Sequence, residues 1–341
     1  MTPHILLEAR SSADVVRRQL RCAHDDHAAT AGHLRAQPPS HVHTLARGSS
    51  GCAAAFLSYL LAARHGVPAG ALQLSALTLH DAPLQVRGSL AVAISQSGQS
   101  PDLVTSMQRL SARGASTLAL VNQMESPLAQ ACLWRADLRA GPELSVAATK
   151  SFVASLVASA LLVSHWRMDA AMLKALDALP HQLDTTVADH EIDATVRALA
   201  PVEHLLVIGR GFGLPLAQEA ALKLKEACGM HAQALSGAEA MHGPVSLAGR
   251  GRTALVFATG GPELPGLIAF ADHLRRLGTN VVLAAPPQIR ERTMTLTPAD
   301  MPELDAVPAI RSFYEVVAAL ATARGFDADQ PPHLRKVTLT L

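Results

Sequence analysis

The hydrophobic positions of this chain form short aliphatic runs that alternate with longer stretches of helical periodicity. Each run ends in a turn rich in glycine or serine, and a helical pattern follows, as at Ala53–His65, Leu103–Arg113 and Leu216–Ala227. Strands that alternate with helices of this length predict parallel sheets flanked by helices. The pattern therefore predicts an α/β protein.

The same runs and turns occur twice in the chain. The matching pairs are Leu45–Gly51 with Val207–Gly213, Leu90–Gly98 with Ala254–Gly261, Thr117–Val121 with Asn280–Ala284, and Pro142–Leu144 with Pro302–Leu304. The offset stays near 160 residues, which is too long for a solenoid repeat and fits a duplicated domain of ordinary size. We therefore expect two similar domains.

The periodicity also predicts where each part begins and ends. The expected parts are a polar, helical N-terminal arm over 1–33, a first domain over 34–175, a connecting helix over 176–197, a second domain over 198–328, and a C-terminal tail over 329–341. Pro331 and Pro332 exclude a simple helix for the tail, so we expect it to lie across a domain.

Only the first copy carries hydroxyl groups at its turns. They belong to Ser49, Ser50, Ser95, Ser97 and Ser100, whereas the second copy offers mainly glycine, proline and apolar residues, with Thr259 the exception. In such folds ligands bind beyond the carboxyl ends of the strands, where helix N-termini present free amides. Hydroxyl groups and amides donate to phosphate oxygens, although serines at such turns often only cap a helix. Because two such turns follow adjacent strands, we favour an oxyanion site.

Composition and charge exclude several other classes of protein. A net charge of +1 argues against nucleic acid or an anionic membrane as a partner. The four cysteines stand far apart in the sequence, which is typical of a reduced, cytoplasmic protein. The N-terminal residues show no pattern of a secretion signal. The most apolar stretch, Phe152–Trp166, is too short and too mixed to span a bilayer, so we expect a buried helix.

Cofactor and metal motifs are weak. The turn Gly209–Gly213 lacks the glycine spacing of a dinucleotide fingerprint, and no acidic residue closes the next strand. His41 and His43 alternate across an expected strand, and His24 and His27 lie on the polar arm. We expect neither a cofactor nor a metal.

The helical pattern after the second glycine turn places Glu219, Lys223 and Glu226 on one face, at spacings i, i+4 and i+7. Such a face is usually solvated. Only five of the 29 basic residues are lysines, however, so arginine is the default cation of this chain. Lysine is not interchangeable with arginine where a compact ammonium is needed. The retained lysines, which also include Lys150, Lys225 and Lys336, favour a specific role for this face.

Several motifs together resemble a known family. They are Ser95–Gly98, Val146–Lys150, Ala220–Glu226, His231–Ala234, Glu239–Pro244 and the tail Asp329–Lys336. In order and spacing they resemble the isomerase half of glucosamine-6-phosphate synthase, which is built of tandem sugar-isomerase (SIS) domains. The opening Arg47–Ser50 resembles that of the stand-alone isomerising glucosamine-6-phosphate deaminases. The resemblance implies two SIS domains, each a flavodoxin-like three-layer sandwich, and no glutaminase domain.

The resemblance also implies roles for individual residues. Ser50, Ser95, Gln96, Ser97 and Ser100 match phosphate-binding positions, and Ser49, Val146, Ala148 and Glu219 are further candidate substrate contacts. Ala148 departs from the family, which often has serine there. Glu226 matches the base that moves a proton between C1 and C2 of the open-chain sugar, with Lys223 beside it. His242 matches a ring-opening histidine that the neighbouring subunit contributes in relatives, and Lys336 matches a tail lysine that closes over the sugar.

The sequence therefore predicts a cytoplasmic, homodimeric aldose–ketose isomerase whose serine turns and Glu226 face a common cavity. The expected reaction converts glucosamine 6-phosphate to fructose 6-phosphate and ammonia. A fructosamine-6-phosphate-type deglycase and another phosphosugar isomerase stay open as alternatives. A sugar-phosphate sensor without catalytic activity is a third alternative, but it leaves Glu226, His242 and Lys336 without a role.

Overall fold

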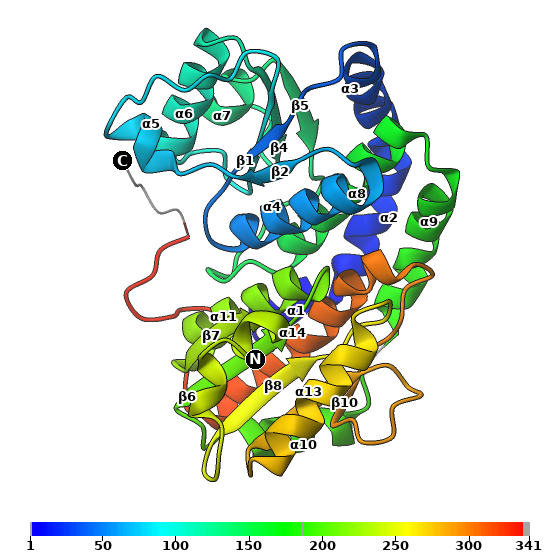
Figure 1. Ribbon diagram of the computed structural model, residues 1–341, viewed down its shortest axis with the longest axis vertical. Coiled ribbons are helices and arrows are strands. Elements are labelled where there is room, and N and C mark those ends of the chain that lie inside the picture. Colours follow the sequence, from blue (N-terminus) through cyan, green and yellow to red (C-terminus); the bar gives the residue numbers. More distant parts are fainter. Residues whose placement is uncertain (1, 186, 337–341) are drawn as a thin grey trace. The chain divides into compact units, whose positions relative to one another are not determined.

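The computed structural model describes residues 2–185 and 187–336, which divide into two compact units. The first, called here the serine-turn unit, comprises Asp14–Glu143, Lys150–Asp177, Arg335 and Lys336. The second, called here the Glu226 unit, comprises residues 2–13, 144–149 and 178–334. Each unit contains one five-stranded sheet covered by helices (Figure 1).

The sheet of the serine-turn unit is entirely parallel and has the strand order β2-β1-β3-β4-β5. Its strands are β1 (Val42–Leu45), β2 (Ala69–Ala71), β3 (Leu90–Ser95), β4 (Ser116–Val121) and β5 (Trp134–Asp137). Every residue of β3 is buried, because helices cover both faces of the sheet. That double burial is why the central strands are continuous apolar runs rather than alternating patterns.

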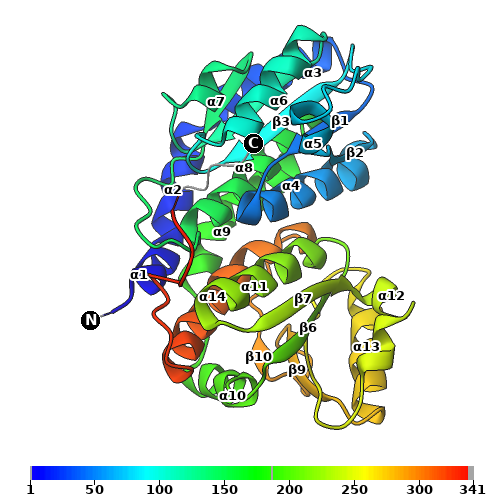
Figure 2. The same ribbon diagram turned by 90° about the vertical axis from the view of Figure 1, so that its left-hand side faces the viewer.

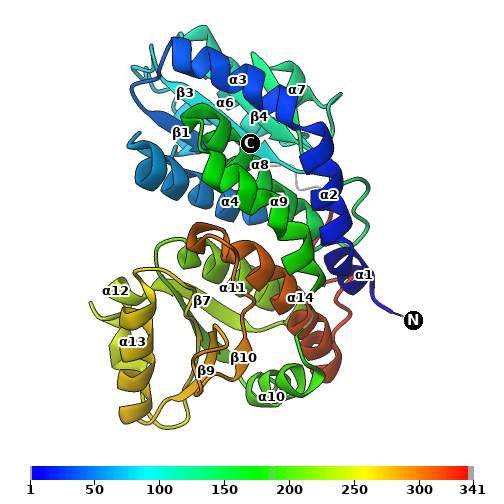
Figure 3. The ribbon, with the colours of Figure 1, turned by 90° about the vertical axis from the view of Figure 1, so that its right-hand side faces the viewer.

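Helices form a layer on each face of this sheet. One layer contains α5 (Leu74–Thr78), α6 (Pro101–Ala112) and α7 (Pro127–Gln130) (Figure 1). In the other, α8 (Lys150–Arg167) contacts both α3 (His24–Ala36) and α4 (Gly48–Leu60), which a π-helical turn over Leu61–His65 extends (Figure 3). The apolar stretch expected to be a buried helix is indeed the core of α8.

The sheet of the Glu226 unit is also entirely parallel, with the order β10-β9-β8-β6-β7. Its strands are β6 (His204–Gly209), β7 (His231–Ser236), β8 (Thr253–Phe257), β9 (Asn280–Ala285) and β10 (Met294–Thr295). On one face lie α11 (Gly213–Cys228) and α14 (Ala306–Ala323), and α14 also contacts α1 (His4–Arg10) and α10 (Asp189–Leu199). On the other face lie α12 (Gly237–Ala240) and α13 (Leu264–Arg276) (Figure 2). Short 3-10 turns cover Pro244–Leu247 and Pro302–Leu304.

The two sheets share one topology. When the strands of each sheet are numbered from its own first strand, both orders read 2-1-3-4-5, the flavodoxin-like arrangement. The turns after the third strands also correspond. Gly98 and Gly261 both have positive φ, +63° and +88°, and a helix begins three residues after each.

Four strands contain no continuous aliphatic run, so the sequence pattern did not predict them. These are β2, β5, β7 and β10, and each lies at an edge of its sheet. An edge strand has a neighbour on one side only and is less buried, as in β7, where most residues are exposed or half-buried. Sequence periodicity therefore identifies the interior of both sheets and misses their edges.

The segments outside the sheets differ from the expectation in two ways. The polar N-terminal arm is in fact three helices, α1, α2 (Ser12–Cys22) and α3, with buried side chains such as Ile5 and Val16. The single connecting helix over 176–197 is wrong, because α9 (Ala170–Asp184) and α10 are separate helices. Amphipathic helices with only a narrow apolar stripe look polar in sequence even when that stripe is fully buried.

One described stretch, Pro302–Ala323, is long and apolar enough to cross a membrane by length and composition. It contains α14, and 83% of the apolar window is buried inside the structure. Core helices pass the same test, so this feature is weak evidence for a membrane span.

Of the two arm histidines considered above, His27 is buried and His24 is half-buried. His27 is 1% exposed, and its pKa is lowered to about 3, chiefly because burial disfavours the charged ring and further because His165 and His24 are close. His24 Nδ1 lies 3.0 Å from His165 Nε2. The Nε2 atoms of His41 and His43 lie 2.9 Å apart, as expected for side chains two residues apart in an extended segment.

We predict that His27 makes the fold sensitive to acid. Its folded pKa lies below its unfolded value of 6.5, so its contribution to stability is intact above pH 6.5 and is lost as the pH falls toward about 3. The loss is at most about 1.4 kcal/mol per pH unit. Urea unfolding of His27→Gln between pH 7 and 4 should show a shallower loss than wild type. His190→Gln, at an exposed position of α10, is the control and should keep the wild-type slope. Equal slopes in all three proteins would contradict the prediction.

Candidate functional site

The serine turns lie at the same edge of their sheet. Ser49 and Ser50 are in the first turn of α4, just after β1, and Ser95 ends β3. Since β1 and β3 are hydrogen-bonded neighbours, their carboxyl ends and the following turns are adjacent. Ser50 and Ser97 are half-buried, so both hydroxyl-bearing turns remain reachable. The structure thus brings these predicted phosphate contacts together.

The serines of the second turn differ in the hydrogen bonds that they make. Ser95 is 6% exposed, and its Oγ accepts a 3.0 Å hydrogen bond from the Gly98 amide, so it closes the turn. Ser97 Oγ accepts a longer bond of 3.3 Å from the amide of Gln99. Ser100 stands at the N-cap of α6, but its side chain makes no capping bond. Ser95 therefore has a structural role in closing the turn, whereas Ser97 and Ser100 are better placed to receive a ligand.

An ion pair missed by sequence reasoning joins the two turns. Arg47 Nη2 lies 2.9 Å from Asp102 Oδ2, and Arg47 Nε donates to the same oxygen at 3.0 Å. Asp102 is buried in the first turn of α6, and its other oxygen accepts the Leu103 amide. Arg47 comes directly before the first serine turn and Asp102 directly after the second, so the pair fixes the spacing between them. The sequence signal for this ion pair was Asp102 itself, an aspartate two residues after Ser100.

A cavity of about 420 Å³ opens beside the second turn, within the serine-turn unit. Gln96, Ser97 and Lys336 line it, and all three were predicted from the sequence. Its remaining lining residues, Gln99, Gln123, Glu125, Ser126, Pro142 and Glu143, were not. This lining combines hydroxyl, amide and ammonium donors with the carboxylates of Glu125 and Glu143, which suits a hydroxyl-rich ligand. The tail residues 337–341 lie outside the described residues.

In the Glu226 unit a protein carboxylate occupies the corresponding position. Gly260 aligns with Ser97, and its amide donates a 2.7 Å hydrogen bond to Asp305 Oδ2. Asp305 Oδ1 accepts the Ala299 amide at 2.8 Å. Burial raises the pKa of Asp305 to about 6, against the opposing effect of these two hydrogen bonds. The second sheet therefore satisfies its turn internally instead of leaving donors for a ligand.

A glutamate side chain likewise occupies the space beside the glycine turn Gly209–Gly213. A Cβ on Gly211 would fall 2.1 Å from Glu263 Oε1, so this glycine makes room for a side chain of the protein. A dinucleotide site would need that space for a pyrophosphate. The structure gives no support to a dinucleotide site here.

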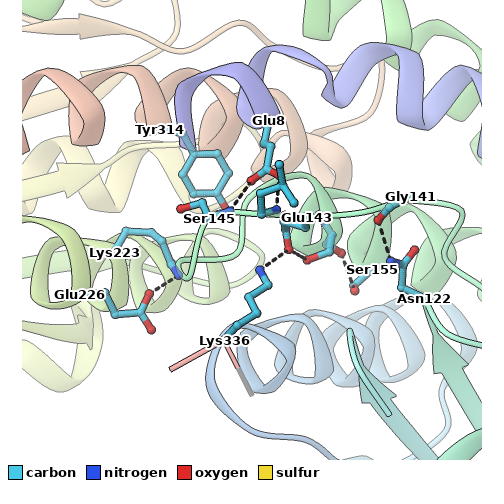
Figure 4. A network of polar contacts seen from close by, with 12 residues as sticks. Glu8, Asn122, Gly141, Glu143, Ser145, Ser155, Lys223, Glu226, Tyr314 and Lys336 are labelled. Atoms are coloured by element: carbon cyan, nitrogen blue, oxygen red, sulfur yellow. Dashed lines mark hydrogen bonds and ion pairs between the residues drawn. The ribbon is translucent and has the colours of Figure 1, made fainter. Parts of the chain in front are cut away.

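The ionisable face of α11 is buried rather than solvated. Lys223 is 1% exposed, and its Nζ forms an ion pair with Glu226 and lies 3.7 Å from Glu219 Oε1 (Figure 4). The hydroxyl of Tyr314 on α14 donates to Glu219 at 3.0 Å. Glu226 keeps 21% of its side chain exposed. Glu219 and Lys223 thus form a buried, hydrogen-bonded support for a carboxylate that can still reach a ligand.

Val146 and Ala148 belong to a segment that the Glu226 unit holds by its backbone. The carboxylate of Glu8 on α1 accepts hydrogen bonds from the amides of Leu144 and Ser145. Val146 and Ala148 are half-buried, between buried neighbours. A segment fixed in this way can present backbone atoms to a substrate, which does not depend on the identity of residue 148.

His242 and Glu226 lie at opposite edges of the sheet of the Glu226 unit. Glu226 is in the last turn of α11, which returns the chain to the amino end of β7. His242 follows α12 at the carboxyl end of β7 and is exposed. A strand of six residues separates the two edges by roughly 20 Å. His242 and Glu226 of one chain therefore cannot act on the same carbon atoms.

Among residues 2–185 and 187–336, no group of three or more histidine, cysteine, aspartate or glutamate side chains is arranged to hold a metal ion. The predicted site residues offer hydroxyl, amide and ammonium groups in the serine-turn unit, and a lysine-supported carboxylate in the Glu226 unit.

These features define an α/β protein of flavodoxin-like topology with hydroxyl-bearing turns at the edge of one of its sheets. Comparison with known proteins supplies the family. The SIS domain model matches residues 37–165. A crystal structure of a candidate phosphosugar isomerase from Silicibacter pomeroyi DSS-3 is 36% identical, covers 96% of this chain and 100% of its own, and has a TM-score of 0.88. The chain belongs to the SIS-domain phosphosugar isomerases.

Two further relatives extend the comparison. Glutamine–fructose-6-phosphate aminotransferase (isomerizing) from Gloeobacter violaceus is 30% identical over 315 residues, which are 86% of this chain and 51% of the relative. The chain spans about half the length of the curated relatives it matches. The C-terminal domain of glucosamine-fructose-6-phosphate aminotransferase from Francisella tularensis, 23% identical, covers 97% of this chain and 99% of its own with a TM-score of 0.85, so it shares the fold. The chain is thus homologous to the isomerase half of these enzymes.

We predict that Gly98→Ala damages the second serine turn. Gly98 has φ +63°, and an added Cβ would lie 2.1 Å from Ser126 Oγ and 2.5 Å from Ser126 Cβ. The strain should cost about 1–3 kcal/mol of unfolding free energy, measured with urea. Gly51→Ala, inside α4 with no atom within 4 Å of the new Cβ, is the control and should be neutral or stabilising. Equal stability of the two variants would show that the turn does not require glycine.

Proposed function

We propose that this protein is a phosphosugar isomerase that converts glucosamine 6-phosphate and water to fructose 6-phosphate and ammonia. The observation that carries the proposal is the half-exposed carboxylate of Glu226 on a buried lysine, in a chain that also has a hydroxyl-lined oxyanion turn. Family membership supports the isomerase part. The deaminase part rests on the resemblance of Arg47–Ser50 to the stand-alone deaminases.

The proposed chemistry needs one base and no external oxidant or reductant. Glu226 removes the proton from C2 of the open-chain aldehyde and returns it to C1, through an enolamine. The C1 oxygen also takes up a proton and the amine gives one up, so that C1 becomes a hydroxymethyl group and C2 an imine. Water then adds at C2, the amine leaves as ammonia, and the ketone of fructose 6-phosphate remains. A positioned general base of this kind contributes about 10²–10⁴-fold to the rate.

The phosphate provides binding energy away from the reacting carbons. Ser50, Ser97 and Ser100 offer hydroxyl donors, and Gln96 adds a side-chain amide. Binding energy from a remote group of the substrate orients the reacting end. Lys336 and the segment with Val146 and Ala148 are proposed as further contacts to the substrate.

We also propose that the second half of the chain is a second SIS domain that has lost its ligand. The shared strand order and the matching glycine turns support this view. Asp305 at the turn equivalent to Ser97 explains why only one half would bind phosphate.

The protein is further proposed to act as a cytoplasmic homodimer. The separation of His242 from Glu226 within one sheet supports a shared site, in which His242 of the partner subunit assists ring opening. Histidine suits this step because it exchanges protons near neutral pH.

The first test is Glu226→Gln. Turnover of glucosamine 6-phosphate, assayed by ammonia release, should fall about 10²–10⁴-fold because the general base is lost. Binding of fructose 6-phosphate, measured by calorimetry, should stay close to wild type. Glu203→Gln changes an exposed carboxylate of the same unit and serves as the control. Wild-type turnover in Glu226→Gln would remove this residue from the mechanism.

An assay with several candidate sugar phosphates distinguishes the proposed deaminase from a deglycase and from a plain isomerase. Purified protein is incubated with glucosamine 6-phosphate, a fructosamine 6-phosphate carrying an amino acid, and plain hexose 6-phosphates. We expect ammonia from the first compound. Release of an amino acid from the second would identify a deglycase, and interconversion of hexose phosphates alone would identify a plain isomerase.

The shared site is tested by mixing subunits. Glu226→Gln and His242→Ala are each expected to be inactive. After co-refolding in equal amounts, half of the dimers should be mixed and each should hold one intact site, which restores about a quarter of wild-type activity. No recovery in a mixture shown to contain mixed dimers would contradict a shared site.

A further inference from the structure

A buried carboxylate beside the cavity of the serine-turn unit has no role in the reaction proposed above. Glu143 lies between β5 and α8, and its side chain is fully buried. It lines the same cavity as Ser97 and Lys336. A buried carboxylate is costly unless charged or polar donors surround it, so its partners indicate its function.

Ser151, in the first turn of α8, donates two hydrogen bonds to Glu143. The hydroxyl of Ser151 donates to Glu143 Oε2 at 2.5 Å, and the Ser151 amide donates to Oε1 at 3.1 Å. The N-terminus of this 18-residue helix also favours a negative charge. Ser151 therefore holds Glu143 rigidly as a hydrogen-bond acceptor.

The segment that carries Glu143 is itself clamped to the sheet. Asn122 follows β4, donates through Nδ2 to the carbonyl of Gly141 at 2.9 Å and accepts the amide of Ala140 at 2.8 Å. Arg18 of α2 donates twice to the carbonyl of Arg139. Figure 4 shows Asn122 and Gly141 next to Glu143. Such support for a side chain is typical of a site that must place a group accurately.

The group that Glu143 places is the ammonium of Lys336. Lys336 Nζ lies 3.4 Å from Glu143 Oε2, and 27% of the lysine side chain is exposed (Figure 4). We propose that Glu143 is a positioning residue, which holds the C-terminal tail in place and directs the Lys336 ammonium into the cavity beside Ser97. This inference rests on the role proposed for Lys336 at the sugar.

A lysine suits this arrangement better than the arginine that the chain otherwise uses. The Lys336 ammonium has three rotatable donors, so it can pair with Glu143 and still donate to a substrate oxygen. Arginine would engage the carboxylate through a planar fork and turn its remaining donors elsewhere.

A double-mutant cycle tests the positioning role. Glu143→Gln and Lys336→Met should each lower kcat/KM for the phosphosugar by roughly 10- to 100-fold, and the double variant should be no worse than Lys336→Met alone. Glu315→Gln, a buried and paired carboxylate on α14, is the matched control and should combine additively with Lys336→Met. Additive losses for Glu143 and Lys336 would mean that Glu143 is only structural and would overturn the proposal.

A second measurement does not depend on any activity. Trypsin cleavage after Arg335, followed by mass spectrometry, should be several-fold faster in Glu143→Gln and in Lys336→Met than in wild type, because the tail loses its anchor. Glu315→Gln should cleave at the wild-type rate. Unchanged cleavage in Glu143→Gln overturns the inference, whereas faster cleavage in a protein without phosphosugar turnover overturns only the proposed function. If Glu143→Gln does not fold, Glu143→Asp takes its place with the same expectations.

Discussion

The structure depends on one constraint: a parallel sheet gathers the N-termini of its helices at one edge, and their free amides need acceptors. The Glu226 unit meets this need internally. Asp305 accepts from Gly260, and Glu263 fills the space left by Gly211. The serine-turn unit instead leaves half-buried hydroxyls and amides beside a cavity. One topology thus produces one closed turn and one site that can receive an anion, which is the basis of the proposed phosphate specificity.

Two groups of buried charged side chains form short networks of ion pairs and hydrogen bonds. Lys223 is buried between Glu219 and Glu226, and Glu219 also accepts from Tyr314. Glu143 is buried among Ser151 and Lys336. A buried charge tolerates little displacement, because its partners cannot be replaced by water. These networks therefore hold the proposed functional groups in fixed positions, and they explain why lysine survives at positions 223 and 336 in an arginine-rich chain.

Much of the fold was predictable because a continuous apolar run in the sequence indicates a buried strand or helix. The interior strands β3, β4, β6, β8 and β9 and the helices α4, α6, α8 and α11 lie where the pattern predicts them. The edge strands, the three N-terminal helices and the break between α9 and α10 were missed or misread. Their burial is partial, so it depends on which neighbour covers them rather than on their own sequence.

By itself the sequence determined the α/β class, the serine turns and the shared face of Glu219, Lys223 and Glu226, because each follows from local spacing. Only the tertiary structure decided that this face is buried, that Ser95 closes its own turn, and that Asp305 occupies the second turn. It also revealed the pairs Arg47–Asp102 and Glu143–Lys336, whose members are 55 and 193 residues apart. Contacts over such distances in sequence leave no periodic signal, because the path of the chain through the sheet brings the partners together.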